Sequence, residues 1–440
     1  MASTYLSKTF AQAGNRRTFT ISYWIKMGQV STGADQAIMG AAQDGSNSDD
    51  LYIHTGRLNF SGYYGSTAYI VRTSAKYKDL SGWYHHVIRF DSTQSTASDR
   101  VRLYVNGELQ SALDENTYPS QNLETTYFNT ARLHTIGSIA YGVPNLPFNG
   151  SMSHFHFCDG YSYGADSFGS TDATTGEWKI NTSPSVSYGT NGFFILKDGN
   201  SVTDQSGQSN NWSVGGGTLT KTEDNPSNVF ATWNPSYYAG GSVTHSAGNT
   251  RFAESGNYWK STLATIGAST GKYYAEFKCN GNWMLAGVVD LNNTLEYGIV
   301  DRNFFSTTHI SSQGYGIYNA DGSLRYRGSE TTYASTYGSG DILQVALDCD
   351  NNRVFFGING TWQNSADPTS SGTGFAMNAT NPIYTFACSV QNDEVHANFG
   401  NGYFNTTAVA SAGTNASGNG IFEYDVPTGY TALSTKGLNL

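Results

Sequence analysis

Hard oxygen ligands gather in one short segment of the chain, Asp44-Gly45-Ser46-Asn47-Ser48-Asp49-Asp50. Ca²⁺ is bound by carboxylate and amide oxygens held on loops of this kind, so Asp44, Asp49 and Asp50 are candidate calcium ligands. The segment departs from the calcium-loop pattern D-x-[DN]-x-[DN]-G, because no acidic residue closes it. A solvated β-turn is the favoured interpretation and calcium is the alternative, and we expect no other cofactor.

Two adjacent histidines, His85 and His86, are candidates for proton transfer or ligand binding, because imidazole titrates near neutral pH. They lie in a segment whose side chains alternate, so one ring must point into a core and the other to the opposite face. We interpret both as structural histidines with satisfied ring nitrogens, and a ligand-binding or pH-sensing role is the alternative. No serine or cysteine with a third orienting group accompanies them, so the sequence predicts no catalytic triad.

Tyrosines in Gly- and Ser-rich segments are the remaining candidates for recognition. Flat sugar faces stack on exposed Tyr and Trp rings, which offer a large rigid contact at low entropic cost. Most tyrosines in a Tyr-rich chain pack internally, and that is the alternative interpretation for each. The predicted ligand or partner surface consists of Tyr63, Tyr64, Tyr69, Tyr161, Tyr163, Tyr333 and Tyr337.

Composition favours strands and turns and argues against several classes of function. The 440 residues include 50 Gly, 30 Tyr and 23 Phe, and only 13% are charged, against roughly 25% in ordinary globular proteins. A net charge of −10 with scattered basic residues argues against binding to nucleic acid or to anionic membranes. No apolar stretch approaches the roughly 18 residues that span a bilayer, so we expect no membrane insertion, and the amino terminus lacks the pattern of a secretory leader.

The four cysteines permit three pairings that the sequence does not distinguish. None lies in a C-x-x-C arrangement, which argues against a zinc site. We expect buried free thiols at Cys158, Cys279, Cys349 and Cys388.

Two hairpins far apart in the chain predict two antiparallel β-domains. In the first, residues 101–105 alternate, and Asn106-Gly107 reverses the chain into residues 108–110. Asn-Gly is the strongest short hairpin signal, because both turn residues need a positive φ. In the second, residues 343–347 turn through Asp350-Asn351-Asn352 and return as residues 353–358.

Hydrophobic alternation and turn residues divide the chain into four parts. Residues 1–165 are predicted to form a first β-sandwich, with strands at 18–26, 83–90 and 152–158. Residues 166–250 are a bridge of strands and loops that completes the first sandwich. Residues 251–405 form a second sandwich, and residues 406–440 form a C-terminal arm that packs on its own chain or on a neighbour. Strands of the second sandwich are expected at 272–279, 284–290, 314–319, 343–348, 353–358 and 383–389.

Two motifs carry a resemblance to known sandwich families. Ser81-Gly82-Trp83-Tyr84-His85-His86-Val87, followed by Arg102-Leu103-Tyr104-Val105-Asn106-Gly107, resembles the laminin G-like branch of the concanavalin A-like superfamily. Residues 271–277, 340–348 and 355–360, with 397–400 as the closing strand, look like a SPRY domain. These resemblances imply an all-β fold of two concanavalin A-like antiparallel β-sandwiches of the jelly-roll type. Laminin G-like domains often bind calcium at a rim, but this chain shows no unmistakable ligand pair there.

The linking residues 188–193 and 209–212 and the closing residues 422–430 and 432–435 are similar to virion proteins of marine tailed bacteriophages. This resemblance implies a structural protein of the particle surface, often a tail fibre, synthesised in the host cytoplasm. It also implies a homo-oligomer, with the trimer as the form common among fibres. The implied partners are other virion proteins of tail or capsid and host cell-surface polysaccharide.

The concanavalin A-like superfamily also includes glucanases, whose E-x-D-x-x-E motif supplies the paired carboxylates of glycoside hydrolysis. The nearest match here is Glu423-Tyr424-Asp425, and Thr428 stands at the third carboxylate position, so the set is incomplete. The leading hypothesis is therefore a non-enzymatic tail fibre or adhesin that binds host-surface glycan and neighbouring subunits. The alternatives are a capsid decoration protein without receptor binding and, less favoured, a glycan hydrolase.

Overall fold

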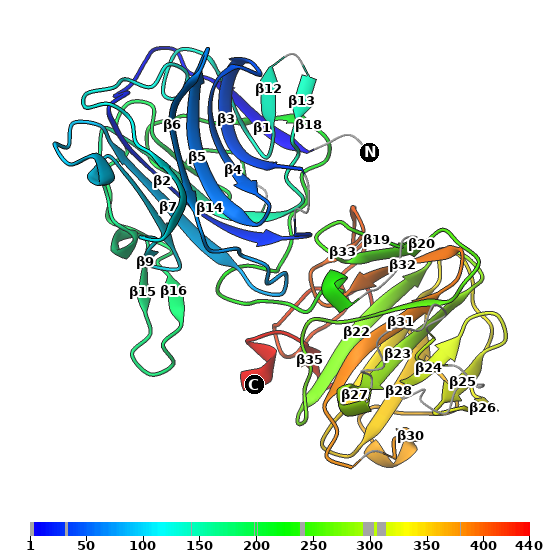
Figure 1. Ribbon diagram of the computed structural model, residues 1–440. Coiled ribbons are helices and arrows are strands. Elements are labelled where there is room, and N and C mark those ends of the chain that lie inside the picture. The colour runs from blue at the N-terminus through cyan, green and yellow to red at the C-terminus, as the bar shows by residue number, and fades with distance from the viewer. Residues whose placement is uncertain are drawn as a thin grey trace. The chain divides into compact units, whose positions relative to one another are not determined.

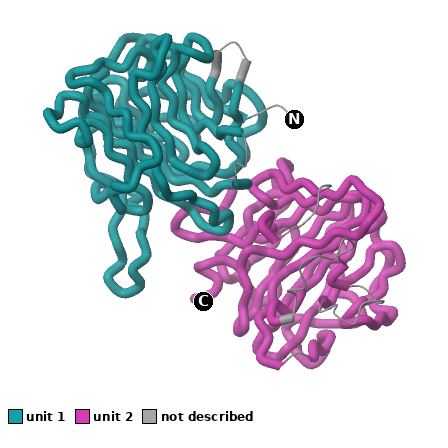
Figure 2. The backbone as a smooth tube through the Cα atoms, in the orientation of Figure 1, with its two compact units in different colours: residues 1–221 teal, residues 222–440 magenta. Residues whose placement is uncertain are grey.

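The computed structural model divides the chain into two compact units, residues 1–221 and residues 222–440 (Figure 2). It describes residues 4–30, 34–141, 143–197, 199, 201–237, 243–293, 303–305, 314–378 and 380–440. Within these residues the only helices are short 3₁₀ turns, and none is long and apolar enough to cross a membrane. They are η1 (Ala97–Asp99), η2 (Ala165–Ser167), η3 (Pro235–Tyr237), η4 (Leu291–Asn293), η5 (Ser371–Thr373) and η6 (Gly437–Asn439).

Unit 1 is an antiparallel sandwich of two sheets (Figure 1). The larger sheet has the spatial order β10 (Leu113–Thr117), β6 (Thr67–Thr73), β5 (Arg57–Tyr64), β4 (Asn47–His54), β3 (Gln36–Asp44), β11 (Leu133–Ile136), β1 (Tyr5–Thr9) and β18 (Ser213–Gly216). The smaller sheet has the order β17 (Phe193–Ile195), β14 (Gly150–Asp159), β2 (Thr18–Met27), β7 (Tyr84–Asp91), β8 (Val101–Val105) and β9 (Glu108–Leu109). Two further hairpins pair β12 (Ile139–Tyr141) with β13 (Val143–Asn145), and β15 (Gly169–Thr171) with β16 (Trp178–Ile180).

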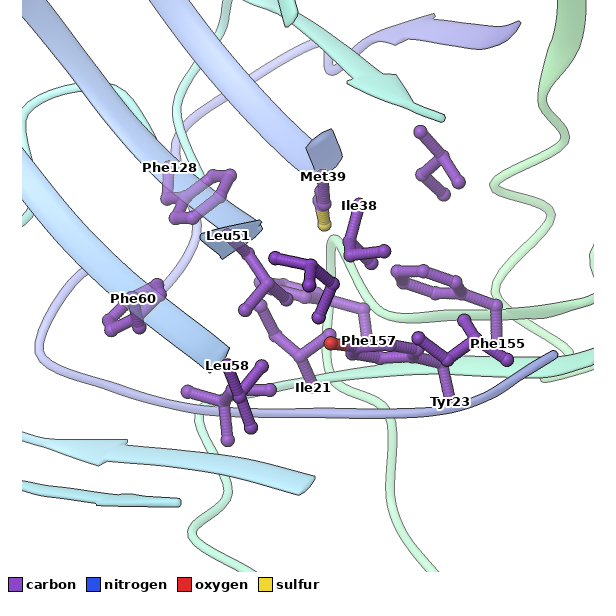
Figure 3. Close-up of a cluster of buried hydrophobic side chains, with 14 of the residues drawn as sticks. Ile21, Tyr23, Ile38, Met39, Leu51, Leu58, Phe60, Phe128, Phe155 and Phe157 are labelled. Carbon is purple, nitrogen blue, oxygen red and sulfur yellow. The ribbon is translucent and has the colours of Figure 1, made fainter. Parts of the chain in front are cut away.

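The core of unit 1 lies between its two sheets. Alternate side chains of β2, including Ile21 and Tyr23, meet Leu51 of β4 and Phe60 of β5 (Figure 3). The outer face of the smaller sheet is buried as well, because a second cluster around Phe168 packs on it.

Unit 2 is a second antiparallel sandwich. Its larger sheet has the order β19 (Val243–Ser246), β20 (Arg251–Glu254), β32 (Asp393–Asn398), β22 (Lys272–Cys279), β27 (Ile342–Asp348), β28 (Arg353–Ile358) and β29 (Thr361–Trp362), and β30 (Phe375–Ala376) and β35 (Thr431–Ala432) pair at its sides. The other sheet has the order β21 (Lys260–Leu263), β31 (Tyr384–Val390), β23 (Met284–Asp290), β24 (Gly314–Tyr318), β25 (Ser323–Tyr326) and β26 (Ser329–Thr332). A short hairpin joins β33 (Tyr403–Phe404) and β34 (Thr407–Ala408).

Both hairpins predicted from the sequence are present, and the all-β fold is confirmed. Asn106 and Gly107 have φ of +47° and +85°, and β8 and β9 flank them as expected. β27 and β28 pair across the second turn, where Asn352 has φ of +52°. The four cysteines are free and buried, as the sequence predicts.

The boundaries between the parts differ from the predicted ones. The predicted bridge, residues 166–250, divides at residue 221. Its first part completes unit 1, since β17 pairs with β14 and β18 with β1. Its last part belongs to unit 2, because β19 pairs with β20 and Trp233 is fully buried in that core.

The C-terminal arm, residues 406–440, packs on its own unit. β35 adds in parallel to β22, and Phe422 and Tyr430 are buried with Tyr274 in one apolar cluster. The ring of Phe422 meets the ring of Tyr274 edge-on at 4.9 Å. The segment is therefore an integral part of unit 2.

Candidate functional site

Asp49, a predicted calcium ligand, is a buried hydrogen-bond acceptor in the core of unit 1. Its Oδ1 accepts the hydroxyls of Tyr64 (2.6 Å) and Tyr69 (2.7 Å), and its Oδ2 accepts the backbone N–H groups of Tyr127 (2.6 Å) and Phe128 (2.9 Å). Burial raises the pKa of the Asp49 carboxyl, and the four donors act in the opposite direction. Asp49 therefore anchors the loop before β11, and two of the predicted sugar-binding tyrosines are its partners.

The three candidate calcium ligands do not form a common site. Asp44 lies at the β3–β4 turn, where its Oδ1 accepts the backbone N–H of Ser46 at 2.8 Å and the pKa of Asp44 is lowered by that bond. Asp49 and Asp50 are neighbours in β4, so their side chains point to opposite faces of the sheet. In the part of the chain that the structure describes, no group of three His, Cys, Asp or Glu side chains could hold a metal ion.

The outer face of the larger sheet of unit 1 is polar, because β4, β5 and β6 alternate strictly. Leu51, Leu58, Phe60 and Val71 point into the core, and the residues between them point outward. We call this set of residues the polar face; it consists of Asp50, Tyr52, Asn59, Ser61, Tyr63 and Arg72. Tyr63 and Arg72 are partly exposed, and the other four side chains are buried.

Hydrogen bonds order the polar face. The Arg72 Nε donates to Asn59 Oδ1 at 3.0 Å, and Asn59 Nδ2 donates to Ser61 Oγ at 3.2 Å. Asp114 in β10 lies 3.4 Å from the Arg72 guanidinium. The guanidinium is thereby fixed over the sheet, with most of its side chain buried. A fixed planar donor group is what a ligand rich in hydroxyls can use without a large entropic cost.

Asp50, a buried member of the polar face, has one carboxylate oxygen without a hydrogen-bond partner among the described residues. The Ser48 hydroxyl donates to Oδ2, and Oδ1 has no hydrogen-bond partner among the described residues. Burial raises the pKa of Asp50 to about 7. Oδ1 lies beside Gly40 and the side chain of Ile139 in β12. Because a buried unpaired acceptor costs free energy, a donor placed here would stabilise the protein.

The predicted tyrosines fall into different environments. Tyr63 belongs to the polar face, whereas Tyr64 and Tyr69 point inward to Asp49. Tyr161 is 41% exposed and stacks on Tyr163, with ring centroids 5.8 Å apart.

The two predicted tyrosines of unit 2, Tyr333 and Tyr337, are buried in its core. The Tyr337 hydroxyl donates to the backbone oxygen of Ile317 at 3.3 Å. Their rings are packed within the sandwich and do not offer a face to a ligand. The predicted tyrosines therefore do not form one surface.

His85 and His86 point to opposite faces, as their alternation predicts. The Trp178 indole N–H donates to His85 Nδ1 at 3.0 Å, so the proton of His85 lies on Nε2, which is 2.9 Å from the Ser22 hydroxyl. His86 Nδ1 lies 3.1 Å from the Tyr23 hydroxyl in the core. Burial lowers the pKa of each histidine to about 3, so both are neutral packing residues at neutral pH.

The carboxylates of the incomplete hydrolase motif are used by the backbone of the C-terminal arm. Glu423 Oε2 accepts the N–H of Ala410 at 2.8 Å, and Asp425 Oδ1 accepts the N–H of Thr414 at 2.6 Å. These carboxylates stabilise turns of the arm and do not face each other across a groove in the described residues.

Asp50, Tyr52, Asn59 and Arg72 were not predicted from the sequence to share one face of a sheet. The signal was present in residues 57–61, Arg-Leu-Asn-Phe-Ser, where polar and apolar side chains alternate. The acidic cluster at residues 44–50 obscured this alternation. In sequence the segment resembles one polar loop, whereas in the structure it contains a turn and the start of β4.

Comparison with known proteins agrees with the fold. Residues 2–161 match the family model described as the concanavalin A-like lectin/glucanases superfamily, which confirms the laminin G-like resemblance of the first unit. Similar solved structures include the SPRY domain of human HERC1 (18% identity, 34% of this chain and 87% of that chain, TM-score 0.26) and a second human SPRY domain (16%, 36% and 96%, 0.25). The heptameric SAP-like pentraxin of Limulus polyphemus is also similar (16%, 45% and 87%, 0.30). No curated protein matches the sequence.

Proposed function

We propose that this protein is a non-enzymatic glycan-binding component of a bacteriophage particle surface, of the tail-fibre or adhesin type. The observation that carries the proposal is the polar face of unit 1, where the partly exposed Arg72 is fixed by the buried Asn59 at 3.0 Å within the matched residues 2–161. The matched superfamily includes lectins, which supports sugar as the ligand class.

The polar face offers the groups that a sugar needs. The guanidinium of Arg72 donates to ring and hydroxyl oxygens, and the Asp114 carboxylate beside it accepts from hydroxyls. The partly exposed ring of Tyr63 supplies a flat apolar surface for the C–H face of a pyranose. Such a site binds through many weak, oriented contacts and requires no cofactor.

The proposal of binding without cleavage is supported by the use of the motif carboxylates. Glu423 and Asp425 each accept a backbone N–H of the arm through one carboxylate oxygen. A retaining glycosidase needs two carboxyl groups about 5 to 5.5 Å apart on either side of the scissile bond. Asp50 is the one carboxylate of the polar face, and Asp114 beside that face is paired with Arg57 and Arg72.

The location on a virion rests on the resemblance of residues 188–193, 209–212 and 422–435 to phage structural proteins. Other virion proteins and host polysaccharide are the proposed partners, with a homo-oligomer as the proposed assembly. A capsid decoration protein shares the resemblance, and it would use the same sandwiches without any receptor.

Glycan binding is tested with the full chain on an array of bacterial surface polysaccharides. We expect saturable binding that Arg72→Ala reduces about tenfold or more, because a charge-assisted hydrogen bond contributes roughly 1.5–3 kcal/mol. Arg72→Lys keeps the charge but loses the planar donor pair, so it should also bind weakly. Arg17→Ala, at an exposed arginine of the same unit, is the matched control. Equal binding by all variants would refute the polar face as the site.

The position on the particle is tested separately by counting copies per virion with quantitative mass spectrometry. Small multiples of three or six are expected for a tail protein. Hundreds of copies, together with no glycan binding, would establish the decoration alternative.

A further inference from the structure

Three aromatic side chains form a cluster on unit 2, which we call the aromatic patch: Trp259, Trp283 and Tyr318. The exposed Tyr258 directly precedes Trp259 in the chain. Trp283 is 49% exposed and Tyr258 is 57% exposed. The ring of Trp259 lies 6.5 Å from that of Trp283 and 5.9 Å from that of Tyr318, and Trp283 lies 6.3 Å from Tyr318. Adjoining aromatic side chains that reach the surface often mark an interaction site.

The strand register brings these residues to one end of one sheet. Lys260 and Met284 both pair with Val390 of β31, so Trp259 and Trp283, which precede them, lie at the same end. Leu285 pairs with Tyr318, which places the last residue of β24 there as well. The patch is thus set by regular strand pairing.

Hydrogen bonds hold the exposed tryptophan in place. The backbone N–H of Trp283 donates to Asp393 Oδ2 at 2.8 Å. The backbone oxygen of Trp283 accepts the backbone N–H of Gln391 at 3.2 Å. Gln391 Nε2 in turn donates to the backbone oxygen of Asn257 at 2.7 Å. Three loops are therefore tied together, and the backbone that carries the indole is fixed in advance of any binding.

The charges at the patch are paired with one another. The Arg325 guanidinium covers the ring of Tyr318 at 4.2 Å and lies 3.4 Å from Asp321 and 3.5 Å from Glu330. The rim of the patch carries exposed amides, at Asn257, Asn282 and Asn392. Paired charges and open amides suit a ligand with hydroxyl groups and no net charge.

The size of the patch favours a small ligand over a protein. A stable protein interface buries about 800 Å² on each partner and involves roughly 20–30 residues a side. Among the described residues of the patch, Trp283 alone presents a large exposed apolar surface, and Trp259 and Tyr318 pack against it. One or two sugar rings match such an area.

We propose that the aromatic patch is a second glycan-binding site, which takes a neutral pyranose by stacking its C–H face on Trp283. The amide rim would hydrogen-bond the hydroxyls of that sugar. This site lies in unit 2, goes beyond the polar face of unit 1, and does not depend on it.

The test uses the full chain and a microarray of neutral oligosaccharides that includes cellohexaose, maltohexaose and chitohexaose, followed by calorimetric titration of the strongest ligand. Trp283→Ala should weaken binding about tenfold or more, because loss of the ring removes most of the stacking surface. Trp283→Phe keeps a flat ring and should retain most of the affinity. Ile383→Ala is the control, because Ile383 is 41% exposed and lies at the opposite end of the same sheet.

Arg72→Ala separates the two sites, since it should leave binding at the aromatic patch unchanged. Thermal unfolding of each variant verifies the fold. The proposal is overturned if no neutral oligosaccharide binds, or if Trp283→Ala binds as tightly as the wild type. It is also overturned if the wild type self-associates in sedimentation and Trp283→Ala does not, because the patch would then be a contact between copies of the chain.

Discussion

The buried carboxylate of Glu276 in β22 accepts the backbone N–H of Tyr424, 2.8 Å away in the C-terminal arm. It also accepts the N–H of Glu423 at 2.9 Å, together with the Tyr274 hydroxyl and an Asn398 amide. One side chain of the sheet thus pairs two backbone donors of the arm, and burial raises the pKa of Glu276 to about 7. The backbone N–H groups of Glu423 and Tyr424 are paired by Glu276, and this links the arm to the sheet of unit 2.

Replacing Glu276 should detach the arm. We expect Glu276→Ala to lower the free energy of unfolding of unit 2 by about 3 kcal/mol, since two buried N–H groups lose their acceptor. Limited proteolysis should then cut within residues 406–430, where the wild type resists. Glu330→Ala, at an exposed strand position, should change stability by no more than about 0.5 kcal/mol. An arm equally protected in both variants would contradict this role.

Asp49 plays the corresponding part in unit 1. Asp49→Ala leaves two tyrosine hydroxyls and two backbone N–H groups without an acceptor, so we expect a loss of about 3 kcal/mol in chemical denaturation. Tyr64→Phe removes one of the four donors to Asp49 and the acceptor of the solvent-exposed Thr126 N–H, and it should cost about 1 kcal/mol. Addition of calcium or of a chelator should leave the stability of the wild type unchanged. A calcium-dependent increase in melting temperature that Asp49→Ala abolishes would revive the calcium interpretation.

The buried histidines predict a pH dependence of stability with a definite sign. The pKa of His85 is about 3 in the folded protein, lowered mainly by burial and further by His86, against an ordinary value of 6.5. Below pH 6.5 the His85 ring therefore binds a proton in the unfolded chain, whereas in the folded protein it stays neutral down to about pH 3. Stability from this group is complete above pH 6.5 and falls as the pH drops toward 3, by up to about 1.4 kcal/mol per pH unit.

Asp50 acts in the opposite direction, because its pKa is raised to about 7 by burial. Its contribution is present at low pH and is lost as the pH rises from about 4 through 7. Comparison of one variant with the wild type separates the two groups. His85→Gln should reduce the slope of unfolding free energy against pH between 4 and 6 by about one proton. If the variant and the wild type show identical slopes, His85 takes up its proton at the same pH in the folded and the unfolded chain, which would contradict this prediction.

Regular elements were predictable from the sequence where alternation and turn chemistry agree. The structure has the hairpin at Asn106-Gly107 and strands β22, β23 and β28 where the sequence predicts them. Side chains that alternate with a period of two favour a strand, and an Asn-Gly turn with positive φ favours a hairpin. The histidine pair was predictable for the same reason, since adjacent strand residues must face opposite ways.

The environment of single polar and aromatic residues was not predictable. Asp49 looks like a loop ligand in sequence, yet its partners Tyr127 and Phe128 lie far along the chain, and only the closed sandwich brings them together. Tyr333 follows a polar strand and precedes Gly- and Ser-rich residues, but its ring fills the core of unit 2. Trp283 is exposed for the converse reason, because it stands one residue before a strand whose pairing fixes it at a sheet end.

Glycan binding without cleavage is the activity that we propose for this protein. The most direct measurement incubates the full chain with purified bacterial surface polysaccharide and follows bound protein and released reducing ends in the same sample. We predict saturable binding that Arg72→Ala weakens about tenfold, with no reducing ends above the buffer control. Release of reducing ends by the wild type, or absence of binding to every polysaccharide offered, would contradict the claim.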